Sequence, residues 1–463
     1  MSNISKILTM ASGAGGGGAF TLKYTTAAND AFNDIGGLSK SIDGTTMFLC
    51  FQMLNASNEY EGYIASFPID DWANPNWEKE ITNNSGSINR CGYSGVCQPS
   101  SSTVFAAGIS NWRTDSNTTD RLWQTITAST GASGDVQSDS NSGQATTLGY
   151  WSVLASPFNT DHVYLAGQYD GKIGSGDQAI VRLVTSSNQV TYQQQAAYGD
   201  SNNDEGAGLA ITSGENLYLG IARLQTSPDL SRYAGVIKVS QGPGNIIWSK
   251  ELSSGNTISD LQYTYSVTND ANNDCVFTGR DNSEAFLARL RNSDGATLGQ
   301  LNIDDSDGTI RGRQVITDSE NNVYVVFSSA SSFKIAKFTD IGNGSSDLDW
   351  CIKVSNNTGS GFNQVMVGSG MALDETTGLL YLWCPNTTAG EYGLVLGYPL
   401  DGSYTGTLGP VDITDATSTL TVTVGTLTNS TRSMTYQTFS PSVTVGGETY
   451  GNSTQFTETL TEG

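Results

Sequence analysis

A short segment recurs seven times along the chain, and this recurrence constrains the fold more than any other feature of the sequence. The segment reads apolar, aromatic, apolar and then small residues, as in Val163–Gly167. Its second positions are residues 48, 105, 164, 218, 276, 324 and 381. The spacing averages about 55 residues, a period typical of repeat architectures rather than of separate domains.

Each copy of the segment has companions on both sides. An apolar run such as Gly208–Ile211 lies upstream, and a third strand such as Ala285–Leu290 and a fourth such as Ile247–Glu251 follow downstream. Turn residues separate these runs, as in 318–322. Four short antiparallel strands in each of seven repeats predict an all-β, seven-bladed β-propeller over about residues 38–411. The small residues of the recurring segment favour an inner strand, and Phe20–Thr25 is expected to help close the ring.

Composition excludes several classes of protein. The 463 residues include 45 acidic and 22 basic side chains, which give a net charge of −23. A chain this acidic is not expected to bind nucleic acid phosphates through a net positive field. The single histidine excludes a metal site with two histidine ligands. No apolar run reaches the length of a membrane-spanning helix. The 53 glycines fit the many tight turns of a propeller.

The two ends differ from the repeats. Residues 1–37 contain a short apolar patch and a glycine-rich stretch, and we expect a docking segment with a hinge. The patch is too short for a secretory signal. Residues 412–463 are rich in Thr and Ser, and Leu420–Val424 alternates apolar and hydroxyl side chains. We predict an extended arm that becomes ordered against a neighbouring subunit, with a disordered tail as the alternative.

The units at Asp270–Leu290 and Asp318–Phe338 resemble the bacterial seven-bladed propeller repeat, which implies a fold and no particular reaction. The two ends, with the run Asp412–Thr417, resemble virion proteins of tailed bacteriophages, marine ones in particular. That resemblance implies a non-enzymatic, tail-associated virion protein, assembled in the host cytoplasm. The propeller would serve assembly or host-surface contact.

The same resemblance implies partners. The chain would form a homo-oligomer and contact other virion proteins through residues 1–20 and 412–463. A host surface glycan is a further possible partner, and nucleic acid and a membrane span are not expected. The alternative is an extracellular protein, a secreted propeller that binds or cleaves glycans.

Two loops have a spacing suited to calcium. Asp200, Asn202 and Asp204 precede Gly206 in the Asp-x-Asn-x-Asp-x-Gly order of a calcium loop. Ile211 at the twelfth position excludes an EF-hand, which leaves a weak Ca²⁺ site or a solvated turn. The run 304–308, Asp-Asp-Ser-Asp-Gly, is a poorer version of the same pattern. No other cofactor is expected.

No catalytic residue is predicted. His162 follows Asp161 in a hairpin turn, where a surface position is more probable than a role in a catalytic triad. Nothing in the sequence distinguishes two carboxylates as a glycosidase pair. The six cysteines are expected to be free thiols, although Cys91 and Cys97 are close enough in sequence to form a disulfide.

Four tryptophans between the early blades are candidate glycan contacts, because exposed aromatic rings stack on sugar rings. The four are Trp72, Trp77, Trp112 and Trp151. The alternative for each is packing in the core or between blades.

Overall fold

In the part of the chain that the structure describes, the regular elements are β-strands and two short 3-10 helices. The computed structural model describes residues 4–10, 18–25, 31–54, 60–82, 91–110, 120–132, 137–140, 149–170, 177–185, 192–199, 203–224, 232–241, 244–253, 263–281, 284–329, 332–342, 344–357, 370–385, 392–425, 428–431, 434–438, 443–445, 449–452 and 456–460.

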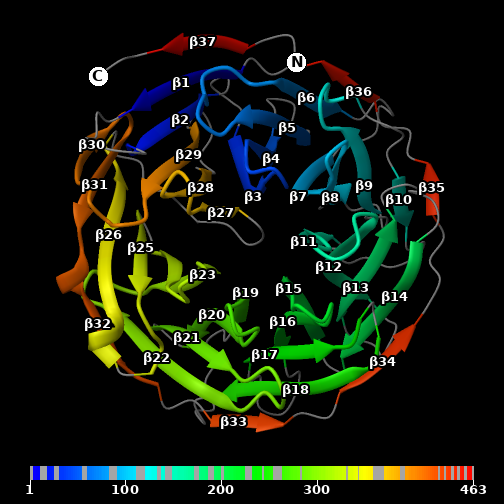
Figure 1. Ribbon diagram of the computed structural model, residues 1–463, viewed down its shortest axis with the longest axis vertical. Helices are drawn as coiled ribbons and strands as arrows, with labels where there is room; N and C mark the ends of the chain where they lie inside the picture. Colours follow the sequence, from blue (N-terminus) through cyan, green and yellow to red (C-terminus); the bar gives the residue numbers. More distant parts are fainter. Residues whose placement is uncertain are drawn as a thin grey trace.

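Seven antiparallel sheets surround a central axis, which confirms the predicted seven-bladed β-propeller (Figure 1). The innermost strands of blades I to VII are β3 (Ala31–Lys40), β7 (Cys91–Ser100), β11 (Tyr150–Ala155), β15 (Asn203–Ile211), β19 (Tyr263–Asn269), β23 (Arg311–Thr317) and β27 (Met371–Asp374). The second strands are β4 (Thr46–Leu54), β8 (Thr103–Ser110), β12 (His162–Asp170), β16 (Leu217–Leu224), β20 (Cys275–Asp281), β24 (Val323–Ser328) and β28 (Leu379–Pro385).

The third and fourth strands complete each blade. The third strands are β5 (Tyr60–Pro68), β9 (Asp120–Thr127), β13 (Asp177–Thr185), β17 (Arg232–Val239), β21 (Glu284–Leu290), β25 (Ser332–Phe338) and β29 (Tyr392–Pro399). The fourth strands are β6 (Trp77–Thr82), β10 (Gln137–Ser140), β14 (Tyr192–Gly199), β18 (Ile246–Ser253), β22 (Thr297–Asp305), β26 (Leu348–Asn356) and, in blade VII, the amino-terminal β2 (Phe20–Thr25). The helix η1 (Gly344–Asp347) precedes β26.

The recurring sequence segment forms the second strand of every blade, not the innermost strand as predicted. The upstream apolar run takes the inner position, because its glycines allow the closest approach between blades. A side chain at Gly208 would lie 2.8 Å from the backbone nitrogen of Val267 on the next blade. The inner pairings also contain β-bulges, as between Gly206 and Gly208 in β15, which bend the strand near the axis.

Each second strand is apolar on both faces because it lies between two blade interfaces. Tyr218 of β16 packs toward blade V, whereas its neighbours Leu217 and Leu219 pack toward blade III. The described core residues therefore form seven apolar clusters, one at each interface between adjacent blades. A strand buried on both faces reads as a continuous apolar run, which is why the segment is visible in the sequence.

Both ends of the chain close the ring. The strand β2 pairs with β29 and so joins the first residues of the chain to its last blade, which confirms the role predicted for Phe20–Thr25. A further strand, β1 (Ile4–Met10), pairs antiparallel with β2. The predicted docking segment therefore contributes two strands to the propeller.

The predicted carboxy-terminal arm runs back around the outside of the chain's own ring, visiting the blades in reverse order (Figure 1). We call its outer strands β31 to β37 the girdle. The bounds are β31 (Val411–Asp415), β32 (Leu420–Val424), β33 (Thr428–Thr431), β34 (Thr435–Thr438), β35 (Val443–Val445), β36 (Thr449–Asn452) and β37 (Phe456–Leu460), with β30 (Gly406–Leu408) before β31 and η2 (Thr417–Thr419) before β32.

The girdle adds one outer strand to every blade, so blades contain five or six strands. Six of its strands pair antiparallel, and β37 pairs parallel with β1. The prediction that the arm is ordered on a neighbouring subunit is thus corrected. The fourth strand of each blade has an open edge, and an extended segment tethered to the same ring can fill it without a second chain.

The first part of the girdle is held by apolar burial as well as by strand pairing. Val411, Ile413, Leu420 and Val422 are at most 8% exposed and join the clusters beside blade VI. Their alternation with exposed residues fits the predicted half-buried strand.

No helix able to span a membrane occurs among the described residues.

Candidate functional site

A cavity of about 330 Å³ opens at the centre of the ring. Its walls come from the inner strands β11, β15, β19 and β23, with Met371 of β27. The lining is Ser152, Leu154, Ala155, Pro157, Gly208, Leu209, Ala210, Ile211, Ser266, Val267, Thr268, Asn269, Gln314, Val315, Ile316 and Met371.

The cavity suits an apolar group or a hydrogen-bonding group rather than acid–base chemistry. None of its described lining residues is an Asp, Glu, His, Lys, Arg or Cys. General acid–base catalysis and covalent catalysis need such side chains or a correctly placed nucleophile with a base. Ser152, Thr268 and Gln314 supply only neutral donors and acceptors.

The turns between first and second strands link neighbouring blades through hydrogen bonds. The Ser213 amide donates to Asn273 Oδ1 at 2.6 Å on the next blade, and the Ala271 amide donates to Asn321 Oδ1 at 2.8 Å. Asn273 and Asn321 adopt the left-handed conformation that such turns require. These turns therefore hold the ring together near its axis.

The acidic residues of these turns are used structurally. Asp270 Oδ1 accepts amide hydrogens from Asn272 and Asp274, both at 2.9 Å. Burial raises the pKa of Asp270 above its ordinary value, although these amides and Arg289 oppose that shift. Asp374 receives a hydrogen bond from Lys40 Nζ at 2.9 Å across the closing interface between blades VII and I.

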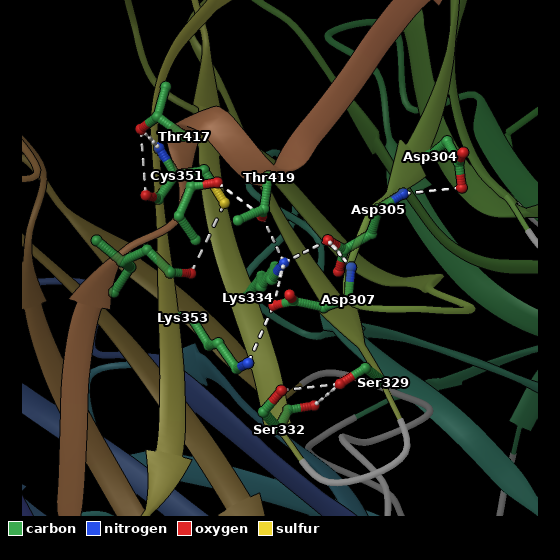
Figure 2. Close-up of polar contacts among 12 residues, drawn as sticks. Asp304, Asp305, Asp307, Ser329, Ser332, Lys334, Cys351, Lys353, Thr417 and Thr419 are labelled. Carbon is green, nitrogen blue, oxygen red and sulfur yellow. Dashed lines mark hydrogen bonds and ion pairs between the residues drawn. The ribbon is translucent and has the colours of Figure 1, made fainter.

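A second polar cluster lies between blades V and VI, at the loop with the poorer calcium-like pattern (Figure 2). Lys334 Nζ donates to Asp305 Oδ1 at 2.6 Å and to Thr419 Oγ1 at 2.7 Å. It also lies 3.2 Å from Asp307 Oδ2, which Lys353 Nζ contacts at 3.0 Å. Hydrogen bonds from Lys353 and Lys334 hold the pKa of Asp307 below its usual range.

This cluster corrects the weaker calcium prediction at 304–308. The oxygens of Asp305 and Asp307 converge on the ammonium of Lys334, so a lysine side chain supplies the positive charge. The stronger candidate, Asp200 with Asn202, lies outside the described residues. Asp204 stands in β15. Groups of three possible metal ligands do not occur among the described residues.

Two of the four candidate glycan contacts are buried, and that prediction is wrong for them. Trp72 is 3% exposed and stacks on Phe67 and Tyr381. Trp77 is 7% exposed, and its Nε1 donates to Ala128 O on the next blade at 2.7 Å. With their rings covered by protein, neither offers a face to a sugar.

The other two tryptophans have different outcomes. Trp151 is half-buried in β11. Trp112 lies outside the described residues. The prediction of glycan contact therefore stays a prediction for these two.

His162 is the first residue of β12, and its Nε2 lies 3.0 Å from Asn159 Nδ2. It is a half-buried residue at the start of this strand, and its described hydrogen bond holds the hairpin. Cys50, Cys97, Cys275, Cys351 and Cys384 are buried free thiols. Since Cys97 is free, the possible disulfide with Cys91 is not formed.

Sequence reasoning missed the Lys334 cluster and the cavity for different reasons. Lys334 lies 29 residues from Asp305 along the chain, and only the packing of two blades brings them together. Its one signal was a lysine at the start of a strand that is otherwise buried. The cavity lining is assembled from small and apolar residues of several blades, which no local pattern connects.

No protein-family model matches the sequence, and no curated protein matches it. Among solved structures, the chain is similar to the β-propeller domain of the Trilobed protease from Pyrococcus furiosus, at 9% identity and a TM-score of 0.39, covering 81% of this chain and 98% of that one.

Two further solved structures are similar. Sqt1 of Chaetomium thermophilum has 9% identity and a TM-score of 0.40, with 82% of this chain and 97% of that chain covered. The endosialidase of phage phi92 has 9% identity and a TM-score of 0.37, with 87% and 70% covered. At identities this low, the likeness says nothing about activity.

Proposed function

We propose that the protein is a non-enzymatic structural component of a bacteriophage virion, associated with the tail, in which the propeller serves assembly or host-surface contact. The observation that carries the non-enzymatic part is the central cavity. Its described lining offers no ionisable side chain for general acid, general base or ionic nucleophile.

The girdle supports a structural role. It caps the outer edge of every blade, and open sheet edges are where chains pair with unintended partners. The ring is also closed by β2 and widened by β1. A ring whose sheet edges are covered, and whose two chain ends both pair with its strands, suits a durable component of a particle. The buried free thiols are compatible with assembly in the reducing cytoplasm of a host.

The virion assignment itself rests on the sequence resemblance of the two ends, and partners, copy number and oligomeric state belong to the proposal. Because the described strands of both ends pair with the chain's own blades, contacts with other virion proteins would use surfaces of the assembled girdle. The extracellular, glycan-directed alternative loses support with the burial of Trp72 and Trp77.

Mass spectrometry and immunogold labelling of purified particles test the proposal. We expect the chain in stoichiometric amount in particles after density-gradient purification, with gold at the tail. A chain found only in the soluble fraction would contradict the virion role. Glycan hydrolysis by the purified chain, lost on Trp151→Ala but kept on Trp72→Phe, would instead favour the glycan-directed alternative.

A further inference from the structure

The side chains of Lys334 and Asp305 form a deeply buried ion pair. Nζ lies 2.6 Å from Oδ1, and the side chains are 1% and 0% exposed. Lys334 reaches from β25 of blade VI to the end of β22 of blade V (Figure 2). Leu420 of the girdle pairs with Asp305, and Ile303 lies two residues before it; both belong to the apolar cluster between blades V and VI.

Two charges at this depth are held at a cost. Each has lost its hydration, and the mutual attraction of a buried ion pair often does no more than offset that loss. An amide made from the same atoms has no net charge, and a neutral polar group is far easier to bury.

The contacts around Asp305 match what condensation needs. Its Oδ1 accepts the backbone N–H of Asp307 at 3.1 Å, which draws electron density from the carboxyl carbon. Its Oδ2 is buried without a hydrogen-bond partner among the described residues. Oδ1 is thus held by a hydrogen-bond donor, and Oδ2 has the position of the leaving group.

We propose that Lys334 and Asp305 are a modification site, where the two side chains condense into an intramolecular isopeptide bond joining blades V and VI. Asp307 is the proton carrier, since its Oδ2 lies 3.2 Å from Lys334 Nζ. Lys353, 3.0 Å from the same oxygen, keeps that carboxylate in position.

The steps balance without any outside reagent. Asp307 takes one proton from the ammonium and passes it to Asp305 Oδ2, which leaves a neutral amine beside a neutral carboxylic acid. The Nζ lone pair attacks Cγ, and the Asp307 amide stabilises the negative charge on Oδ1. A second Nζ proton moves through Asp307 to the Oδ2 hydroxyl, the Cγ–Oδ2 bond breaks, and water leaves. The product is an Nζ–Cγ amide.

The bond would form beside the start of the second girdle strand, β32. Thr419 of η2 contacts the same Nζ, and β32 starts at the next residue. The cross-link closes a loop through two blades and so prevents them from separating at this interface. This inference does not depend on the virion assignment.

Mass spectrometry of the purified, denatured full-length chain tests the bond. We expect a mass one water molecule below that of the sequence, after allowance for removal of Met1. Tryptic digestion should leave Lys334 uncleaved and release a branched peptide that carries Asp305. A wild-type chain at full mass, with trypsin cutting normally at Lys334, would overturn the proposal.

A matched control separates burial from proximity. Lys337 of β25 and Asp349 of β26 form an ion pair at 2.9 Å within blade VI, but their side chains are 17% and 42% exposed. We expect no bond there, so a branched peptide at Lys337 would refute the argument from burial.

Two variants test the assigned roles. Lys334→Arg keeps the positive charge and should restore the full mass. Asp307→Asn should leave most of the folded chain unlinked, because the proton carrier is gone. Protection of the Cys351 thiol from alkylation reports that each variant is folded. A fully linked, folded Asp307→Asn chain would show that Asp307 is not the proton carrier.

Discussion

Replacement of Trp248 by Ala is expected to lower the free energy of unfolding by about 3–5 kcal/mol. Trp248 stands in the fourth strand of blade IV, is 7% exposed, and packs beside Tyr218 in the cluster shared with blade V. The ring also covers Gly295, whose backbone has φ of 70° and could not carry a side chain there without strain. The cost is the lost burial of the indole and the cavity left at the blade interface.

The hydrogen bond is the smaller part of that cost. Trp248 Nε1 donates to Asn292 O at 3.1 Å, but the same carbonyl also accepts Lys238 Nζ at 2.7 Å. Loss of the indole donor therefore leaves no orphaned acceptor, and Trp248→Phe should cost about 1–2 kcal/mol.

Urea-induced unfolding, followed by tyrosine fluorescence and circular dichroism, measures both values. Ile247→Ala is the matched control, because Ile247 is the preceding residue and is 45% exposed. We expect the order Trp248→Ala, then Trp248→Phe, then Ile247→Ala near zero. If Trp248→Ala lies within about 1 kcal/mol of the control, packing of this ring does not hold blades IV and V together.

Three further predictions concern the closing interface between blades VII and I, the thiols and the girdle. The pKa of Asp374 is lowered, because hydrogen bonds from Lys40 and Thr377 outweigh the effect of burial; the stability from this group is present above its ordinary value of 3.8 and is lost as the pH falls through the lower folded value. Lys40→Met should be less stable at neutral pH and lose less stability on acidification, and a urea midpoint falling as steeply as in the wild type would contradict this. Burial raises the pKa of the Cys384 thiol, so a thiol reagent should label it only after unfolding, and rapid labelling of the folded chain would refute its placement. Leu420→Ala should cost about 2–5 kcal/mol, whereas Thr421→Ala on the exposed face should cost almost nothing, and equal effects would show that the girdle is not held by burial.

The propeller was predictable because one physical requirement repeats in every blade. The second strand lies between two interfaces, so residues such as Tyr218 and Leu219 are apolar on both faces and mark the period. The order of strands toward the axis was harder to predict. Small residues such as those at 166–167 fit any narrow place, and only the approach of Gly208 to Val267 shows which strand is innermost.

Single side chains were predicted less well, because their roles depend on the neighbouring blade. Trp77 looked like a loop aromatic, yet it donates to Ala128 O of blade II. Trp350 of blade VI repeats this contact with Leu400 O of blade VII at 3.2 Å. Both partners lie about 50 residues ahead, close to one repeat period. A tryptophan at the start of a fourth strand is therefore a blade-to-blade contact, a rule that the period could have suggested.

The girdle shows why a partner could not be predicted for the arm. Leu420–Val424 correctly predicts a half-buried strand, but strand pairing uses backbone groups that every residue possesses. Any blade edge, on this chain or another, offers the same row of donors and acceptors. The choice depends on tether length: η2 and the short links between girdle strands allow each strand to reach only the next edge around the ring. The seven blade edges recur at the repeat spacing, and the girdle strands meet them one after another around the ring. This arrangement favours the chain's own ring, since pairing within one chain requires no loss of translational freedom.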